Sequence, residues 1–489
     1  MRLKKLLPLS LVFAIGHLCS FAQTSKDNTK WDLRRCVQYA LDNNIAVRKS
    51  IIAAENQDLT YKQSKASQYG QASFGTQMGL NFGRSVDPTT NLFTTSQQLY
   101  QTYSVQAGAN LFNWFSTRRY IEANRYLYQA YESLIDQSKN DVTLNVAAAY
   151  LQSLLLREQT NLAKTKLELT RQQLENTRRL VVAGAVPELN AAELETQYAT
   201  DTSAIISAQQ SFDTQVLTLK VAMNLDPAVP FELDTPAVES IPIEPIAEMQ
   251  PDVVYSIAVK AFPQQKINDL KISSAQKFAQ YNKGTMFPTL SIYGSLGNNF
   301  ANELRRAVVT PGLDVPTQLY VDNSGVKFPV YTPTSTTSFE KQPVGKVFGP
   351  YWTQLDNNFR QQIGVNLSVP IFNGLQTKTN YEKSKLNIKS ANLDKESDLI
   401  ILKQNIYNAY YNAVAYLQKF EANKKQVATA ERSFDLATKR YNVGLLNSID
   451  YLTNQNNMFT ARINLLYSQY QYVFQMKVLE YYKGLGVKL

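Results

Sequence analysis

The helical character of the chain follows from residues 399–444, which read LIILKQNIYNAYYNAVAYLQKFEANKKQVATAERSFDLATKRYNVG. In heptads counted from Leu399, the first position and the position three later carry apolar or small side chains almost throughout. This is the pattern of a coiled-coil seam. The first positions are Leu399, Ile406, Ala413, Phe420, Val427, Phe434 and Tyr441, and the later ones are Leu402, Ala409, Tyr416, Asn423, Ala430 and Ala437.

The seam belongs to one very long helix. Residues 375–443 contain neither Gly nor Pro, so the pattern predicts a helix that begins just after Gly374 and ends at Gly444. At 1.5 Å per residue, a helix of roughly 65 to 70 residues is about 100 Å long. A second helix then returns, with a predicted seam at Ile449, Leu452, Phe459, Ile463, Leu466, Tyr470 and Val473.

The first half of the chain repeats this arrangement. Residues 365–374 align with residues 105–114, and Gly444 aligns with Gly184, both at a separation of 260 residues. Upstream, residues 258–262 align with residues 40–44 at a separation of 218, so the second copy holds 42 additional residues. The sequence therefore predicts an internal two-fold repeat, residues 23–225 and 251–489, joined by a Pro-rich linker at 226–250.

Four shorter segments, residues 74–82, 105–111, 290–296 and 363–371, alternate apolar with small or polar side chains. Segments of about ten residues with this period fit strands that cross a bilayer. A soluble two-sided sheet would show the same alternation. Aromatic residues near the predicted strand ends favour the membrane interpretation, because aromatic side chains gather at membrane interfaces; they are Tyr100, Tyr103, Phe300, Tyr351, Trp352 and Phe359.

The additional residues lie in a segment at about 299–356 that is rich in Pro, Gly, Thr and Tyr. Long extracellular loops are usual in outer-membrane barrels, so we interpret this segment as a surface loop. A lid or a partner-docking loop is the alternative.

Residues 1–22 have the pattern of a secretory signal peptide, with basic residues at positions 2, 4 and 5, an apolar run and a small-residue cleavage site at Ala22. Cys19 raises the question of lipid attachment, but the residues before it are a poor lipidation sequence. Removing this segment leaves 47 Lys and Arg against 40 Asp and Glu residues, no His, and Cys36 as the one Cys.

This composition excludes the commonest catalytic tools, which are His-based triads, His metal clusters and disulfide chemistry. We expect no enzyme activity, no metal and no cofactor. The bases are spread along predicted helices, so nucleic-acid binding is not predicted. Cys36 falls on the apolar face of a helix predicted over residues 31–67, with a break at 42–44, and is expected to be a packed thiol.

The twice-repeated order of helix, strand, strand, long helix, turn and helix, together with YNVGL at 441–445 and IDYL at 449–452, resembles the TolC-like outer-membrane efflux proteins. These are the outer-membrane factors of tripartite efflux and type I secretion systems. The resemblance implies an α+β membrane protein whose trimer forms one barrel of twelve strands, four per chain. A periplasmic α-helical coiled-coil barrel continues it. Four strands cannot close a barrel alone, which gives the trimer a physical reason.

The resemblance also implies a function and partners. The protein would passively export drugs, toxic compounds or secreted molecules that it receives from a periplasmic adaptor protein and an inner-membrane RND or ABC pump, and its barrel would contact outer-membrane lipid. A secreted coiled-coil structural or adhesive protein without a pore is the alternative.

Functional residues of the family map onto the turns between long and returning helices. Asp450 matches an aspartate that rings the periplasmic gate, Tyr441 keeps an aromatic position, and Asn190 is the counterpart of Asp450 in the first repeat. Thr453 stands where a second acid is often found, and Leu446 replaces a basic residue. For Asp450, the alternative is an ordinary acid at a helix start.

The family's adaptor-docking motif is matched by Val443, Gly444 and Leu445, with Gly184 as a weaker counterpart. Glycines allow another helix hairpin to approach the backbone closely. The same glycines could simply end their helices.

Overall fold

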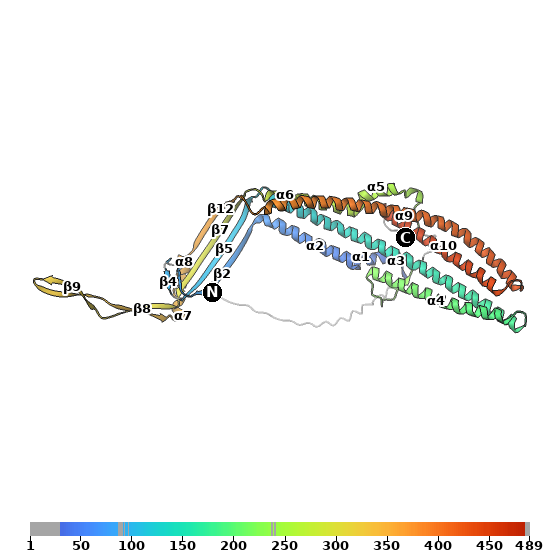
Figure 1. Cartoon of the computed structure of the whole chain (residues 1–489), viewed down its shortest axis with the longest axis horizontal. Coiled ribbons are helices and arrows are strands. Elements are labelled where there is room, and N and C mark those ends of the chain that lie inside the picture. Colours follow the sequence, from blue (N-terminus) through green and yellow to red (C-terminus); the bar gives the residue numbers. More distant parts are fainter. Residues whose placement is uncertain are drawn as a thin grey trace, which may run out of the picture. The chain divides into compact units, whose positions relative to one another are not determined.

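The computed structural model describes residues 30–86, 91, 93–95, 97–235, 238 and 241–484 (Figure 1). The predicted signal peptide and Cys19 lie outside these residues. The chain divides into two compact units. The first comprises residues 1–47, 140–254 and 406–489, and the second comprises residues 48–139 and 255–405.

Within the described part of the second unit, the four predicted strands form one antiparallel sheet in the order β12-β7-β5-β2. Strands β2 and β12 are its edges. The strands are β2 (Gln71–Asn81), β5 (Gln98–Phe112), β7 (Thr289–Glu303) and β12 (Arg360–Ser368).

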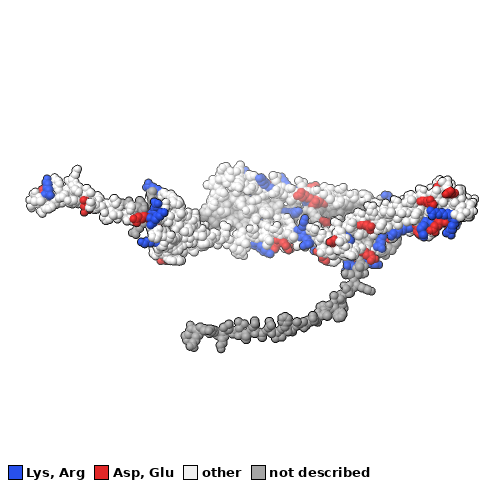
Figure 2. All heavy atoms as spheres, turned by 90° about the horizontal axis from the view of Figure 1, so that it is seen from below, with Lys and Arg blue, Asp and Glu red and all other residues white. Residues whose placement is uncertain are grey.

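The register gives this sheet two chemically distinct faces, because alternate residues of a strand share a face. One face is apolar: Ala109 pairs with Ile292, which pairs with Val365, and a neighbouring row joins Val105 to Leu296. The opposite face carries small or uncharged polar groups in rows such as Ser73, Gln106, Ser295 and Gln362. Within these strands only Glu303 and Arg360 are charged, and much of the strand region is white in Figure 2.

All four strands differ in their boundaries from the predicted segments. Strand β5 begins at Gln98 and β7 continues to Glu303, so Tyr100, Tyr103 and Phe300 lie within strands. Strand β12 ends at Ser368 rather than at 371. Pro370 explains the early end, because its nitrogen carries no hydrogen for the ladder.

The segment at about 299–356, which we interpreted as a surface loop, contains regular secondary structure. It contains two antiparallel pairs, β8 with β11 and β9 with β10, followed by two short helices. Cross-strand pairing satisfies the backbone polar groups of a segment this long. These elements are β8 (Arg305–Pro311), β9 (Val315–Asn323), β10 (Val326–Thr332), β11 (Ser335–Lys341), α7 (Val344–Val347) and α8 (Tyr351–Asn357), and a smaller pair, β3 (Arg84–Val86) and β4 (Phe93–Thr95), joins β2 to β5.

The long helices agree closely with the prediction. Helix α9 (Gln376–Asn442) and helix α3 (Ser116–Val182) each have 67 residues. Every residue named on the α9 seam is buried or half-buried. The returning helices are α4 (Glu188–Met223) and α10 (Ser448–Tyr482), and the shorter ones are α1 (Leu33–Asn43), α2 (Ile45–Ala66), α5 (Pro251–Ala261) and α6 (Pro263–Gly284).

The predicted seam of α10 is partly wrong. Leu452, Phe459, Tyr470 and Val473 are buried, but Ile449 and Ile463 are 61% and 39% exposed. No described helix is both long enough and apolar enough to cross a membrane.

The core of the first unit joins α1, α3, α4, α10 and the linker. Cys36 is fully buried there, and burial, with a smaller contribution from the Asp32 carboxylate, raises the pKa of its thiol to about 12. The prediction of a packed thiol is therefore confirmed. The linker contains one short strand, β6 (Glu232–Leu233), which pairs in parallel with β1 (Lys30–Trp31).

The linker is also anchored to α10 by a buried ion pair. The Lys477 ammonium lies 2.8 Å from the Glu480 carboxylate, and both side chains are at most 5% exposed. Lys477 also donates to the Pro242 carbonyl, and Glu480 accepts a hydrogen bond from the Glu244 backbone N–H at 3.1 Å. Residues more than 230 positions apart are thereby held together.

Candidate functional site

The predicted site residues lie at the two turns that join long and returning helices, residues 183–187 and 443–447, here called the first and second hairpin ends. Both turns have the same local geometry. Gly184 and Gly444 have φ of 68° and 76°. The next residue donates to the carbonyl five positions back, Ala185 to Leu180 and Leu445 to Arg440, at 2.9 Å each. This is the glycine C-cap called a Schellman motif.

Both glycines also border open space. A Cβ added at Gly184 or Gly444 would meet no atom within 4 Å. The apolar residues beside them are exposed, with Val443 at 67%, Leu445 at 70% and Val182 at 90%. Each hairpin end therefore combines a helix-ending glycine with an accessible backbone and an exposed apolar rim.

Asp450 lies in the first turn of α10, where it is exposed and forms a local cap. Its backbone N–H donates to the Asn447 side chain at 2.7 Å, and the Asn447 amide donates back to Oδ2 of Asp450 at 3.0 Å. Such reciprocal bonds satisfy free groups at a helix start. Thr453, also exposed, directs its hydroxyl to the Ile449 carbonyl at 2.8 Å.

Tyr441 is a packing residue in this structure. It is 8% exposed, its ring centroid lies 4.8 Å from that of Tyr451, and its hydroxyl lies 3.3 Å from the Thr177 hydroxyl of α3. The surrounding cluster takes Leu174 and Leu194 from the other hairpin. Burial raises the pKa of Tyr451 to about 12, so its phenol stays protonated at neutral pH. Tyr441 therefore holds the two hairpins together.

Glu193 is a site residue that we did not single out from the sequence. Its carboxylate accepts a hydrogen bond from Ser448, the first residue of α10. This contact joins the second turn of α4 to the first residue of α10, and so brings together the helix starts that carry Asn190 and Asp450. A sequence signal for Glu193 existed, because it stands 260 residues before Thr453 and so supplies, in the first repeat, the acid that is absent from the second.

A second polar junction lies deeper between the hairpins. The Asp201 carboxylate, 1% exposed, accepts from Thr170 at 2.7 Å and from Gln197 at 2.7 Å, and pairs with Lys166 at 2.9 Å. Gln455 of α10 donates to the Thr170 hydroxyl at 3.2 Å. Because buried polar groups are costly unless partnered, this junction fixes how α3, α4 and α10 align.

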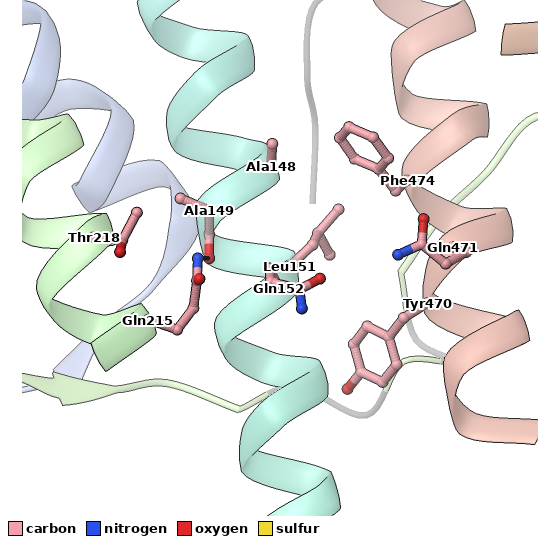
Figure 3. Close-up of a pocket in the computed structure, with 9 residues that line it drawn as sticks. All are labelled: Ala148, Ala149, Leu151, Gln152, Gln215, Thr218, Tyr470, Gln471 and Phe474. Carbon is pink, nitrogen blue, oxygen red and sulfur yellow. Dashed lines mark hydrogen bonds between the residues drawn. The ribbon is translucent and has the colours of Figure 1, made fainter. Parts of the chain in front are cut away.

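A cavity of about 330 Å³ also lies among these helices (Figure 3). Tyr470 and Phe474 of α10 line one side, and Gln215 and Thr218 of α4 line the other. Gln215 is tied to the Ala149 carbonyl at 3.3 Å. The lining contains no Asp, Glu, Lys, Arg, His or Cys side chain. Within the described residues, no group of three or more His, Cys, Asp or Glu side chains is arranged to hold a metal ion.

A family model described as "Outer membrane efflux protein" matches residues 36–225 and 348–480. The chain is 20% identical over 448 residues to the outer membrane efflux protein BepC of Brucella suis biovar 1 (strain 1330), covering 92% of this chain and 80% of BepC. It is 22% identical over 479 residues to the outer membrane protein TolC of Escherichia coli (strain K12), covering 96% of this chain and 84% of TolC.

Solved structures show the same fold. CusC aligns with a TM-score of 0.72 at 14% identity, covering 93% of this chain and 92% of that one. The Campylobacter jejuni CmeC outer membrane channel aligns with a TM-score of 0.69 at 16% identity, covering 93% and 86%. The family model does not match residues 226–347. These include the linker and the two antiparallel strand pairs formed by β8 to β11.

Proposed function

The chain belongs to the outer membrane efflux protein family, and from this premise we propose that it is the outer-membrane duct of an export system. It is a TolC-like protein of the outer membrane, with β-barrel and coiled-coil parts. We propose that cargo moves passively through a lumen that this chain lines, that the energy comes from an inner-membrane RND or ABC pump, and that the chain itself catalyses no reaction.

The observation that carries this proposal is the two-faced sheet. Its apolar face suits lipid and its uncharged polar face suits a water-filled lumen. Its two edge strands, β2 and β12, leave backbone groups that lipid cannot satisfy. Pairing β12 of one copy with β2 of the next removes both edges, and three copies give a twelve-stranded barrel. A secreted coiled-coil protein without a pore would have no use for such a sheet.

We propose the following organisation of the chain. Residues 1–22 are a cleaved signal peptide, residues 23–225 and 251–489 are structural repeats, and residues 226–250 link them. Equal lengths of α3 and α9, 67 residues each, support the repeat. The segment at about 299–356 lies on the extracellular side, and the hairpin ends lie in the periplasm.

We propose that the hairpin ends serve two purposes. Val443, Gly444 and Leu445, with Gly184 on the first hairpin end, dock a periplasmic adaptor protein. The exposed apolar rim and the accessible glycine backbone support this assignment. Asp450, Asn190, Thr453 and Tyr441 form the gate region. There Asp450 supplies charge, and the burial of Tyr441 supports a role in holding the closed arrangement.

We expect the mature protein to be a trimer that requires detergent. The physical reason is that one copy exposes two strand edges and an apolar sheet face. Light scattering coupled to size exclusion in detergent measures the mass of the protein component. A monodisperse monomer that inserts into bilayers unaided would contradict the trimer and the shared barrel.

Replacing Asp450 with Asn is expected to weaken block by a trivalent cation added on the periplasmic side in planar-bilayer recordings, and to lower cation selectivity. Three carboxylates within a Debye length of about 8 to 10 Å of one another would concentrate cations at the entrance. Asparagine keeps an acceptor for the Asn447 amide, so the cap is preserved.

Asp435→Asn is the matched control, since Asp435 is an exposed acid on α9 that is paired with Lys439 and lies two turns before the second hairpin end. Glu193→Gln measures how much an acid of the first repeat contributes to cation block and selectivity. We expect a smaller effect there, because Ser448 already bonds that carboxylate. If cation block and selectivity are unchanged in Asp450→Asn, Asp450 is an ordinary acid at a helix start and has no role in the gate.

A further inference from the structure

Helices α7 and α8, residues 344–357, form a cover over one face of the sheet at the strand ends farthest from α6 (Figure 1). The contacts are specific. Asn302 donates to the Val347 carbonyl at 2.7 Å, the Ala301 N–H donates to Gln354 at 3.0 Å, and the Asn298 amide donates to the Leu355 carbonyl. Val347 is buried against Leu99 and Phe300.

The register identifies the covered face. Leu296, Asn298 and Phe300 stand two residues apart along β7, and Leu296 pairs with Val105 on the apolar face. Residues two apart on a strand share a face, so the cover sits on the apolar face. It lies just beyond the apolar rows, where the strand residues become Asn298, Gln101 and Asn302.

The cover changes which aromatic residues can meet lipid. We predicted that Phe300, Tyr103 and Tyr351 belong to an interfacial girdle. Phe300 is fully buried, and the Tyr103 and Tyr351 hydroxyls lie 2.6 Å apart. The cover instead exposes Val344 at 73% and Trp352 at 77%, whereas Phe348, 37% exposed, stacks on Phe300 with their ring centroids 5.7 Å apart.

The cover lies on the same face of the sheet as the apolar rows, beyond their last residues, Leu296 and Val105. Large apolar side chains gathered at one place on a surface mark an interaction site. Tryptophan prefers the water–lipid boundary, where its ring is apolar and its N–H stays wet. The exposed Lys346 on α7 adds a charge that suits headgroup phosphates.

We propose that the α7–α8 cover lies in the headgroup region of the lipid surface around the barrel, with Val344 and Trp352 in contact with lipid. The cover thereby sets the depth of the barrel in the membrane. This inference rests on the proposed function, which places the apolar face of the sheet against lipid.

Trp114 supplies an internal reference at the other rim of the same face. Its ring packs against Phe112, 5.4 Å away, and Phe112 pairs with Leu290, which shares its face with Ile292. Trp114 is 46% exposed and follows the opposite end of β5 from the cover. If the strands span a bilayer, Trp114 and Trp352 report on its two boundaries.

The test uses single-tryptophan variants of the full-length protein in phosphatidylcholine vesicles. Trp31→Phe with Trp114→Phe leaves Trp352, and Trp31→Phe with Trp352→Phe leaves Trp114. Acyl chains brominated near the headgroup or near the chain end quench tryptophan by depth, and acrylamide quenches it from water. We expect Trp352 to be quenched more strongly by the shallow bromines than by the deep ones, and to be shielded from acrylamide.

Two results would overturn the inference. Quenching of Trp352 by acrylamide but by neither bromolipid would mean that the cover stays in water. Protection from all quenchers would mean that a neighbouring copy covers it. If Trp114 is quenched by bromolipid in either case, the strands still span the bilayer and only the inference fails.

If Trp114 also escapes the bromolipids, the membrane role of the sheet fails as well. Comparing the wild type with Trp352→Phe gives the same information about the cover with Trp31 and Trp114 intact, so the test does not depend on the multiple variants folding.

Discussion

Replacing Val365 with Arg is expected to prevent most of the protein from assembling in the outer membrane. Val365 lies in the middle of β12, is 61% exposed and pairs with Ile292 on the apolar face. An arginine facing lipid near the bilayer centre costs about 2 to 4 kcal/mol in each copy. The amount of heat-modifiable trimer in purified outer membranes measures the effect.

Two neighbouring positions are matched controls for the Val365 variant. Asn366→Arg places the same side chain on the polar face, beside Ser291, and should assemble normally. Leu367→Arg is on the apolar face but next to the end of β12, where the cost of a charge falls to about 0 to 1 kcal/mol. We therefore expect an intermediate loss. Equal assembly of Val365→Arg and Asn366→Arg would show that the faces are assigned wrongly.

Replacing Lys477 with Met is expected to destabilise the first unit by about 3 to 5 kcal/mol, because it leaves the buried Glu480 carboxylate without its counter-charge. The carbonyl of Pro242 would also lose a donor. Thermal unfolding in detergent, followed by circular dichroism of the helices, should show a lower midpoint.

Lys439→Met is the control for this second variant. Lys439 pairs with Asp435 at 2.7 Å, but both side chains are more than half exposed, so its loss should cost at most about 1 kcal/mol. The double variant Lys477→Met, Glu480→Met removes the uncompensated charge and should recover part of the stability. A Lys477 variant as stable as the wild type would mean that the linker is anchored by other contacts.

The buried ion pair and the proposed gate lie in different parts of the hairpins. The Lys477–Glu480 pair fixes the linker to α10 near the end of that helix, whereas the hairpin ends are joined by Tyr441, Thr177 and the Ser448–Glu193 contact. Any opening at the hairpin ends would have to break the latter contacts. It could leave the linker anchor intact.

The features that the sequence determined are those encoded by neighbours along the chain. The 67-residue length of α9, its end at Gly444 and the buried seam follow from a helical period uninterrupted by Gly or Pro. The two faces of the sheet follow from alternation, since side chains of a strand alternate between faces. The helix break near Asn44 and the packed Cys36 thiol were predictable for the same local reason.

The features that only tertiary structure decided depend on contacts between residues far apart in sequence. The cover formed by α7 and α8 buries Phe300 because Asn298 and Asn302 bond its backbone, and no local period indicates that docking. Ser448 meets Glu193, and Glu480 meets Glu244, only once the helices have packed at a particular alignment. Periodicity states which face of an element is apolar, but the position at which two faces meet is set by the fit and hydrogen bonding of both partners.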